Sequence, residues 1–124
     1  MPATILVVDD SKVVRALVRD ALLADDHQVV EAPGAREALA ALENAPVDLV
    51  ITDINMPDGG GLALVRTLRA RPRERFLPIL VLTTEDDDAI KRQGREAGAT
   101  GWLVKPFDPD QLLHTVRRVL EARA

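Results

Sequence analysis

The sequence predicts a doubly wound α/β fold, in which a five-stranded parallel sheet lies between two layers of helices. Four apolar runs are continuous rather than alternating, which is typical of parallel strands buried on both faces. These runs are "TILVV" (4–8), "VDLVIT" (47–52), "PILVLT" (78–83) and "GWLV" (101–104). A helical pattern follows each strand, and right-handed crossovers place such helices on both faces of a sheet, which gives three layers.

The first strand and the first helix begin this pattern. After the run 4–8, apolar residues repeat at i, i+3, i+4, i+7 and i+8, as Val14, Leu17, Val18, Ala21 and Leu22. Ser11 precedes this helix and is expected to be its N-cap. A weaker apolar run, "HQVVEA" at 27–32, is expected to be the fifth strand of the sheet.

The second and third helices have shorter apolar faces. Their apolar residues are Ala35, Ala38, Leu39 and Leu42 in the second helix, and Leu64, Val65 and Leu68 in the third. We expect the third helix to end near Arg71, because Pro72 cannot continue it.

The last two helices differ in the strength of their patterns. The segment "EDDDAIKRQGREAG" (85–98) begins with acids, which suit a helix N-terminus, but Gly94 and a small apolar side predict a loosely held helix. The final helix is strongly patterned, with Asp108 as its expected N-cap. Its apolar residues are Leu112, Leu113, Val116, Val119 and Leu120.

Composition and charge exclude several classes of function. The chain has 124 residues, 47% of them hydrophobic and 29% charged, which predicts one globular domain over 1–124. A net charge of −4 and only three aromatic side chains argue against direct binding to nucleic acid. No apolar run has a membrane-spanning length, no secretory signal pattern is present and there is no cysteine, so the expected location is the cytoplasm.

Polar residues follow the strands at the edge where their carboxyl ends meet. They are Asp9 and Asp10 after the first strand, Asp53 after the run 47–52, Thr83 and Thr84 at the end of the fourth run, and Lys105 after the last. Ligands of doubly wound sheets bind at this edge, near the point where the strand order reverses. Three carboxylates would repel one another there, and a hard divalent cation removes that repulsion. Mg²⁺ prefers oxygen ligands, so Asp10, Asp53 and the backbone carbonyl of Asn55 are candidate ligands.

Asp53 ends an apolar strand and is followed by the loop "INMPDGGG". A carboxylate beside Mg²⁺ can act as a nucleophile toward phosphorus, and Lys105 and the Thr83 hydroxyl are expected to neutralise and hydrogen-bond the transferred group. The glycines leave small residues where a phosphoryl donor must approach. The residues therefore predict a phosphoryl-transfer site at Asp53.

Four short motifs occur together in a specific order and spacing. They are "ILVVDD", "DINMPDGGG", "LTTE" and "GWLVKPF". Each motif alone is weak, but jointly they resemble the receiver domain of two-component response regulators, from about residue 4 to residue 121. The resemblance implies a flavodoxin-like, CheY-like sandwich and Mg²⁺ as the cofactor.

The resemblance assigns the chemistry of the site residue by residue. Asp53 resembles the aspartate that accepts the phosphoryl group, and Asp9 and Asp10 resemble the acidic pair that organises Mg²⁺. Lys105 falls on the active-site lysine of the family, and its bond to Pro106 is usually cis in this fold.

The resemblance also assigns a switch and positions that tune phosphoryl lifetime. Thr83 falls on the switch hydroxyl, and Trp102 on the switch aromatic, whose ring moves between exposed and buried rotamers in the family. This movement remodels the surface of the fourth helix, fifth strand and fifth helix. Asn55, Glu85 and Thr84 lie where the family tunes phosphoryl lifetime. The alternative interpretation of Trp102 is a partly buried core residue.

Within the family, the chain looks most like a stand-alone chemotaxis regulator of the CheY type, with no output domain expected within the chain. The expected partners are a histidine kinase as phosphodonor and a downstream protein, such as the flagellar motor switch or a phosphatase. Phosphate relay to another histidine, or a phosphate-sink role, is the alternative. We expect a monomer or weak dimer that is a switch rather than an enzyme, limited to self-phosphorylation and autodephosphorylation.

Three other functions compete with this interpretation. A phosphohydrolase with an aspartyl intermediate typically needs an acid two residues beyond Asp53, where Asn55 stands. A nucleotide or flavin site would need a glycine- or hydroxyl-rich phosphate loop, where "DDSKVV" offers carboxylates. The third is a receiver that binds partners without being phosphorylated. His27 and His114 are expected to be surface residues, so no catalytic histidine is expected.

Overall fold

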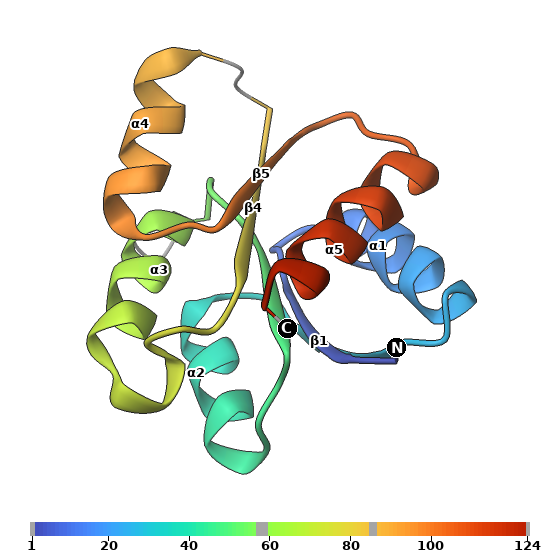
Figure 1. The fold of residues 1–124 in the computed structure, drawn as a ribbon, viewed down its shortest axis with the longest axis horizontal. Helices are drawn as coiled ribbons and strands as arrows, with labels where there is room; N and C mark the ends of the chain where they lie inside the picture. The colour runs from blue at the N-terminus through green and yellow to red at the C-terminus, as the bar shows by residue number, and fades with distance from the viewer. Residues whose placement is uncertain (1, 57–59, 85–86, 124) are drawn as a thin grey trace.

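The structure, a computed structural model, describes residues 2–56, 60–84 and 87–123. Its centre is one sheet of five parallel strands in the order β2-β1-β3-β4-β5 (Figure 1). The strands are β1 (Thr4–Val8), β2 (Gln28–Ala32), β3 (Leu49–Asp53), β4 (Ile79–Thr83) and β5 (Gly101–Val104). The chain winds outward from β1 in one direction to β2 and in the other to β5, so the strand order reverses between β1 and β3.

Helices cover both faces of the sheet, as the sequence predicts (Figure 1). On one face lie α1 (Lys12–Ala24) and α5 (Pro109–Arg123), which contact each other. On the other lie α2 (Ala35–Asn44), α3 (Gly60–Ala70) and α4 (Asp88–Ala97), with a 3-10 turn, η1 (Pro72–Glu74), after α3. Among the described residues, no helix combines the length and apolar character needed to cross a membrane.

The predicted boundaries are largely confirmed. β1 and β5 have the predicted residues, whereas β3 begins later than the run 47–52 and extends to Asp53. Both predicted N-caps are present: the Ser11 hydroxyl accepts a hydrogen bond from the Val14 N–H (3.2 Å), and the Asp108 carboxylate accepts one from the Gln111 N–H (2.7 Å). The predicted helix 85–98 is observed as Asp88–Ala97, and Glu85 lies outside the described residues.

The placement of His27 on the surface is wrong, because this side chain is buried with 6% of its area exposed. Its Nδ1 accepts a hydrogen bond from the Ala3 N–H (3.0 Å), a backbone donor that precedes β1. A buried donor without an acceptor is unfavourable, so the ring satisfies a main-chain group that the sheet leaves unpaired. His114 is exposed on α5, as predicted.

Side chains alternate along each strand between two cores, and this alternation fixes where the strand-end residues point. In β1, Ile5 and Val7 belong to the core under α1 and α5, and Asp9 continues the series two residues later. In β3, Ile51 belongs to the same core, and Asp53 continues it. Both carboxylates therefore lie on the α1/α5 face of the sheet, at its carboxyl edge.

Candidate functional site

Three aspartates meet at the edge of β1 and β3, beside the point where the strand order reverses. One carboxylate oxygen from each of Asp9, Asp10 and Asp53 lies within 4.8 Å of the others. Asp9 is fully buried and Asp53 is 5% exposed, whereas Asp10 faces solvent. The cluster is thus two buried carboxylates with a third at the mouth, an arrangement that could hold a hard cation.

Lys105 supplies positive charge to this cluster from the end of β5. Its Nζ lies 3.0 Å from Oδ2 of Asp9 and 3.3 Å from Oδ1 of Asp53, and its side chain is only 16% exposed. The Lys105 backbone N–H donates to the Thr83 carbonyl (2.7 Å), which ties the residue to the end of β4. The bond from Lys105 to Pro106 is cis, as the resemblance implied.

Backbone donors orient the two buried carboxylates. The Ser11 N–H donates to Oδ1 of Asp9 (2.9 Å), and the Asn55 N–H donates to Oδ1 of Asp53 (3.3 Å). Arg15 also contributes, because its Nη1 donates to the Asp9 carbonyl (2.6 Å). The sequence analysis missed Arg15. Its position one helical turn after the cap Ser11, close to the end of β1, is the signal that could have identified it.

The charge at the site is not balanced. Burial raises the pKa of the Asp53 carboxyl, and the neighbouring Asp9 charge raises it further, whereas the Asn55 N–H and Lys105 act in the opposite direction. Lys105 is the cation that contacts both Asp9 and Asp53, so one positive charge serves two buried carboxylates. Additional positive charge at this position would stabilise the ionised form of Asp53.

The helix that follows Asp53 approaches its backbone very closely. A Cβ at Gly61 would overlap the Asp53 carbonyl oxygen, and the Gly61 N–H donates to the Ile54 carbonyl (3.0 Å). Only glycine fits the first turn of α3 this close to the strand end. The role of Gly61 is therefore packing of α3 against Asp53, in addition to the open approach expected from the sequence.

The predicted switch residues lie on the other face of the sheet. Thr83 follows Val81 by two residues in β4, and Val81 belongs to the core under α2, α3 and α4. Trp102 is paired with Val81 in the β4–β5 register and packs against that same core. Thr83 is fully buried, so its hydroxyl lies inside the molecule rather than at the mouth of the site.

The three positions predicted to tune phosphoryl lifetime are Asn55, Thr84 and Glu85, and the structure describes the first two. Asn55 is exposed and contacts Asp53 through its backbone N–H, while the predicted ligand role of its carbonyl stays a prediction. Thr84 is exposed at the end of β4. Glu85 lies outside the described residues, so its predicted tuning role stays a prediction too.

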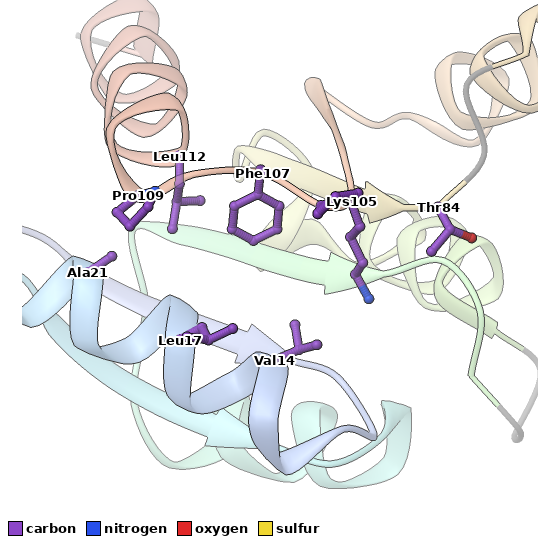
Figure 2. Close-up of a pocket in the computed structure, with 9 residues that line it drawn as sticks. Val14, Leu17, Ala21, Thr84, Lys105, Phe107, Pro109 and Leu112 are labelled. Carbon is purple, nitrogen blue, oxygen red and sulfur yellow. The ribbon is translucent and has the colours of Figure 1, made fainter.

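An apolar cleft of about 390 Å³ opens beside the site, between α1 and the segment that enters α5. Figure 2 shows α1 residues across this cleft from the β5–α5 segment, with Lys105 and Thr84 at one end. The labelled apolar residues are Val14, Leu17, Ala21, Phe107, Pro109 and Leu112. Leu17 fits the apolar period of α1 but is 63% exposed, so its side chain borders the cleft rather than filling the core.

The fold and this site together define a class: doubly wound α/β proteins with an acidic site at the carboxyl edge of a parallel sheet. Comparison with known proteins gives the family. Residues 5–117 match the Response regulator receiver domain family. The chain belongs to this family, whose members are the receiver domains of two-component systems.

Individual relatives support this assignment. Response regulator MprA of Mycolicibacterium vanbaalenii is 40% identical over 120 residues, which cover 97% of this chain and 51% of MprA. The Chemotaxis protein CheY homolog of Campylobacter jejuni is 38% identical over 118 residues, 94% of this chain and 91% of that protein. Chemotaxis protein CheY4 of Vibrio cholerae matches in structure with a TM-score of 0.92 and 44% identity, covering 96% and 99% of the two chains. The chain therefore spans about half the length of MprA and nearly all of the CheY relatives.

Proposed function

We propose that this receiver is a phosphorylation switch that accepts a phosphoryl group on Asp53 from a histidine kinase. The observation that carries the proposal is the position of Asp53, a buried carboxylate 3.3 Å from Lys105 Nζ and clustered with Asp9 and Asp10. In the reaction, an oxygen of Asp53 forms a bond to phosphorus as the bond from phosphorus to the donor nitrogen breaks. The released imidazole keeps that electron pair.

The cofactor that fits this site is Mg²⁺. Asp9 and Asp53, which share Lys105, form with Asp10 at the mouth an oxygen-rich donor set with excess negative charge. Asp9, Asp10 and Asp53 would hold the ion, together with the carbonyl of Asn55. When bound, Mg²⁺ supplies positive charge for the phosphoryl oxygens.

The chain's own residues perform the other tasks. The Asn55 N–H and Lys105 hold the Asp53 carboxylate, and Ser11 holds that of Asp9. Once Asp53 is phosphorylated, Lys105 can pair with the new charge, and the Thr83 hydroxyl can donate to it if β4 and its following segment shift. This movement couples the site to Trp102 on the other face of the sheet.

The chain is proposed to be a switch and not a multiple-turnover enzyme. Its self-catalysis would comprise phosphorylation from a donor and hydrolysis of its own aspartyl phosphate. The residue two positions beyond Asp53 is Asn55, which cannot serve as a general acid for phosphoester turnover.

The apolar cleft between α1 and α5 is proposed to be where the kinase docks. A donor histidine must reach Asp53, so its protein has to cover the surface immediately around the site. The cleft opens beside Lys105, and its exposed Leu17 offers apolar area to a partner helix. A partner of this kind would bury its own apolar helix face there.

A chemotaxis role is proposed for the output. The CheY relatives are covered over 91% and 99% of their lengths, whereas MprA is covered over about half. The output partner would then be a protein of the flagellar motor switch or a phosphatase, bound at the α4, β5 and α5 surface of a monomer or weak dimer in the cytoplasm. The alternative is a relay intermediate or a phosphate sink.

Mass spectrometry after incubation with acetyl phosphate tests the proposal. With Mg²⁺ the intact chain should gain the mass of one phosphoryl group, and without Mg²⁺, or in Asp53→Asn, it should not. Asp20→Asn, on the exposed surface of α1, is the matched control and should be phosphorylated normally. A phosphorylated Asp53→Asn variant would contradict the assignment of Asp53.

A further inference from the structure

The turn that joins α3 to β4 is strongly basic, although the chain as a whole is acidic. Residues 69–76 read "RARPRERF", four arginines with one glutamate, whereas the whole chain has a net charge of −4. Pro72, Arg73, Arg75 and Phe76 are exposed in this segment and together form the basic turn. The other two arginines have a different role, so they are considered first.

Arg69 and Arg71 are used inside the fold. Arg69 donates from Nε to the Gly98 carbonyl (2.9 Å) and from Nη1 to the Glu74 carbonyl (3.0 Å). Nη2 of Arg71 lies 3.3 Å from Oε1 of Glu74 and also pairs with Glu43 of α2. Glu74 is the one acid of the segment and is only 4% exposed. Its charge is therefore matched by Arg71 and does not neutralise the exposed arginines.

The guanidinium groups of the basic turn have no acidic partner among the described residues. Nη2 of Arg73 contacts only the Leu42 carbonyl (3.5 Å), and Arg75 lies over the Phe76 ring with its Cζ 5.2 Å from the ring centroid. Phe76 is 84% exposed. A single exposed apolar side chain is common on protein surfaces, but an aromatic ring beside unpaired arginines has the composition of an interface centre.

The backbone of the basic turn is already fixed. It forms the 3-10 turn η1, which begins at Pro72. The Glu74 N–H donates to the Arg71 carbonyl (3.2 Å), and the Leu77 N–H donates to the Glu74 carbonyl (3.2 Å). With the Glu74 side chain buried beneath it, the turn presents its exposed side chains from a rigid base. Little backbone entropy is then lost when a partner binds.

We infer that the basic turn is a docking site for a short acidic segment of a partner protein, in which carboxylates flank an apolar side chain. The carboxylates would pair with Arg73 and Arg75, whose planar heads suit bidentate contacts, and the apolar side chain would cover Phe76. A membrane or duplex nucleic acid is an extended anionic surface. It would also meet acids such as Glu43, whose side chain is 62% exposed beside Arg71. A short segment avoids this repulsion.

The basic turn is remote from the phosphorylation site. It precedes β4, at the amino end of the strands, whereas Asp53 lies at their carboxyl end (Figure 1). A strand of five residues separates the two ends by roughly 16 Å. A segment bound at the turn leaves Asp53 open, so docking and phosphorylation are independent. The inference goes beyond the proposed function and does not rest on it.

Fluorescence anisotropy with a dye-labelled peptide, in which glutamates flank a central pair of leucines, tests the charge contacts. Wild type should bind this peptide, and Arg73→Ala/Arg75→Ala should raise its Kd at least about fivefold. Arg36→Ala/Arg118→Ala removes the same charge from exposed positions of α2 and α5, and should leave the Kd unchanged. Equal weakening by the two double variants, or none in either, overturns the inference.

The role of Phe76 is tested with a second peptide in which glutamates replace the leucines. Wild type should bind this peptide at least about threefold more weakly than the first, and Phe76→Ala should remove the difference between the two peptides. Leu23→Ala, which truncates a 50% exposed leucine of α1, should preserve the difference. A difference that persists in Phe76→Ala overturns the apolar contact.

Other occupants of the basic turn are distinguished by the same variants. Phosphatidylserine vesicles or duplex DNA that bind wild type more tightly than the first peptide, and lose binding in Arg73→Ala/Arg75→Ala, would overturn the choice of an acidic segment. A concentration-dependent dimer in sedimentation velocity that Phe76→Ala abolishes would overturn it in favour of a second copy of the chain.

Asp53→Asn separates this inference from the proposed function. The variant should bind the first peptide with wild-type Kd, and Arg73→Ala/Arg75→Ala should be phosphorylated by acetyl phosphate as wild type is. Normal peptide binding in a chain that acetyl phosphate fails to phosphorylate supports the docking site and contradicts only the proposed function. Peptide binding that is lost in Asp53→Asn overturns the independence of the two sites.

Discussion

Asp53 is a residue whose proposed function is obtained at a cost in stability. It is buried next to Asp9, and burial followed by the Asp9 charge raises the pKa of its carboxyl above the ordinary value of 3.8. An acid with a raised pKa in the folded state binds its proton more tightly there than in the unfolded chain. The contribution of Asp53 to stability is therefore fully present below the ordinary pKa of 3.8, and it is lost as pH rises through the raised folded-state pKa.

The first prediction follows from this sign. Without Mg²⁺ at neutral pH, Asp53→Asn should have a higher free energy of unfolding than wild type, because the amide carries no charge to repel Asp9. Urea denaturation at several pH values measures it, and the difference should shrink as pH falls into the acid range. A variant less stable than wild type at neutral pH would show that the interaction with Lys105 outweighs burial and repulsion.

His27 supplies the second prediction. His27→Ala leaves the Ala3 N–H buried without an acceptor, so it should lower the free energy of unfolding by about 1–3 kcal/mol. His114→Ala, on the exposed face of α5, should change it by less than about 0.5 kcal/mol. Equal effects of the two substitutions would contradict the structural role of the His27 ring.

Helix α1 presents two exposed leucines in different surroundings. Leu17 is 63% exposed and borders the apolar cleft beside the site, while Leu23 is 50% exposed near the other end of the helix, away from the cleft lining. Both can be replaced without opening the core. Substitutions of Leu17 and Leu23 can therefore be compared to distinguish the loss of a cleft residue from the loss of any exposed leucine on α1.

The third prediction uses that pair. Leu17→Glu should slow phosphotransfer from a histidine kinase that phosphorylates wild type by at least about tenfold, which corresponds to about 1.4 kcal/mol of lost contact. Phosphorylation by acetyl phosphate, which needs no docking surface, should be unchanged. Leu23→Glu should behave as wild type with both donors, and a comparable loss in Leu23→Glu would place docking elsewhere on α1.

Helix α4 shows how far an element can be predicted from its own sequence. Its acidic start and limited apolar side are visible in the pattern, and the helix is found at Asp88–Ala97. The glycine within it looked like a source of looseness, but it is the contact point for Trp102 on a strand that follows later in the chain. Such a reason exists only in the tertiary structure, so no local pattern could contain it.

At the scale of the whole molecule, the sequence predicted those features that depend only on the spacing of apolar residues. Continuous apolar runs identified the strands, and the parallel sheet then brought Asp9, Asp53 and Lys105 to one edge. Alternation within strands also separates Asp53 from Thr83, a distinction that the sequence analysis did not draw. His27 and Arg15 were misjudged or missed because each contacts backbone groups of a neighbouring element, and such contacts leave no period in the sequence.

Mg²⁺ should stabilise the folded molecule as a whole. A ligand that binds the folded chain alone raises the free energy of unfolding by mass action, by about 2.7 kcal/mol at a hundred times its Kd. Thermal unfolding should therefore shift upward with Mg²⁺ and return with EDTA, with a smaller shift in Asp10→Asn. Identical midpoints with Mg²⁺ and with EDTA would exclude a metal site in the acidic cluster.

The alternation of side chains across the sheet has a further consequence for how two partners share this small chain. The acidic cluster opens on the flank of α1 and α5, and the indole ring with its glycine lies behind the strands on the flank of α4. The proposed kinase cleft lies between α1 and α5, and the proposed output surface comprises α4, β5 and α5, so α5 would be the one element that both partners contact. Under the proposed function, we expect the two partners to compete only where their contacts meet on α5.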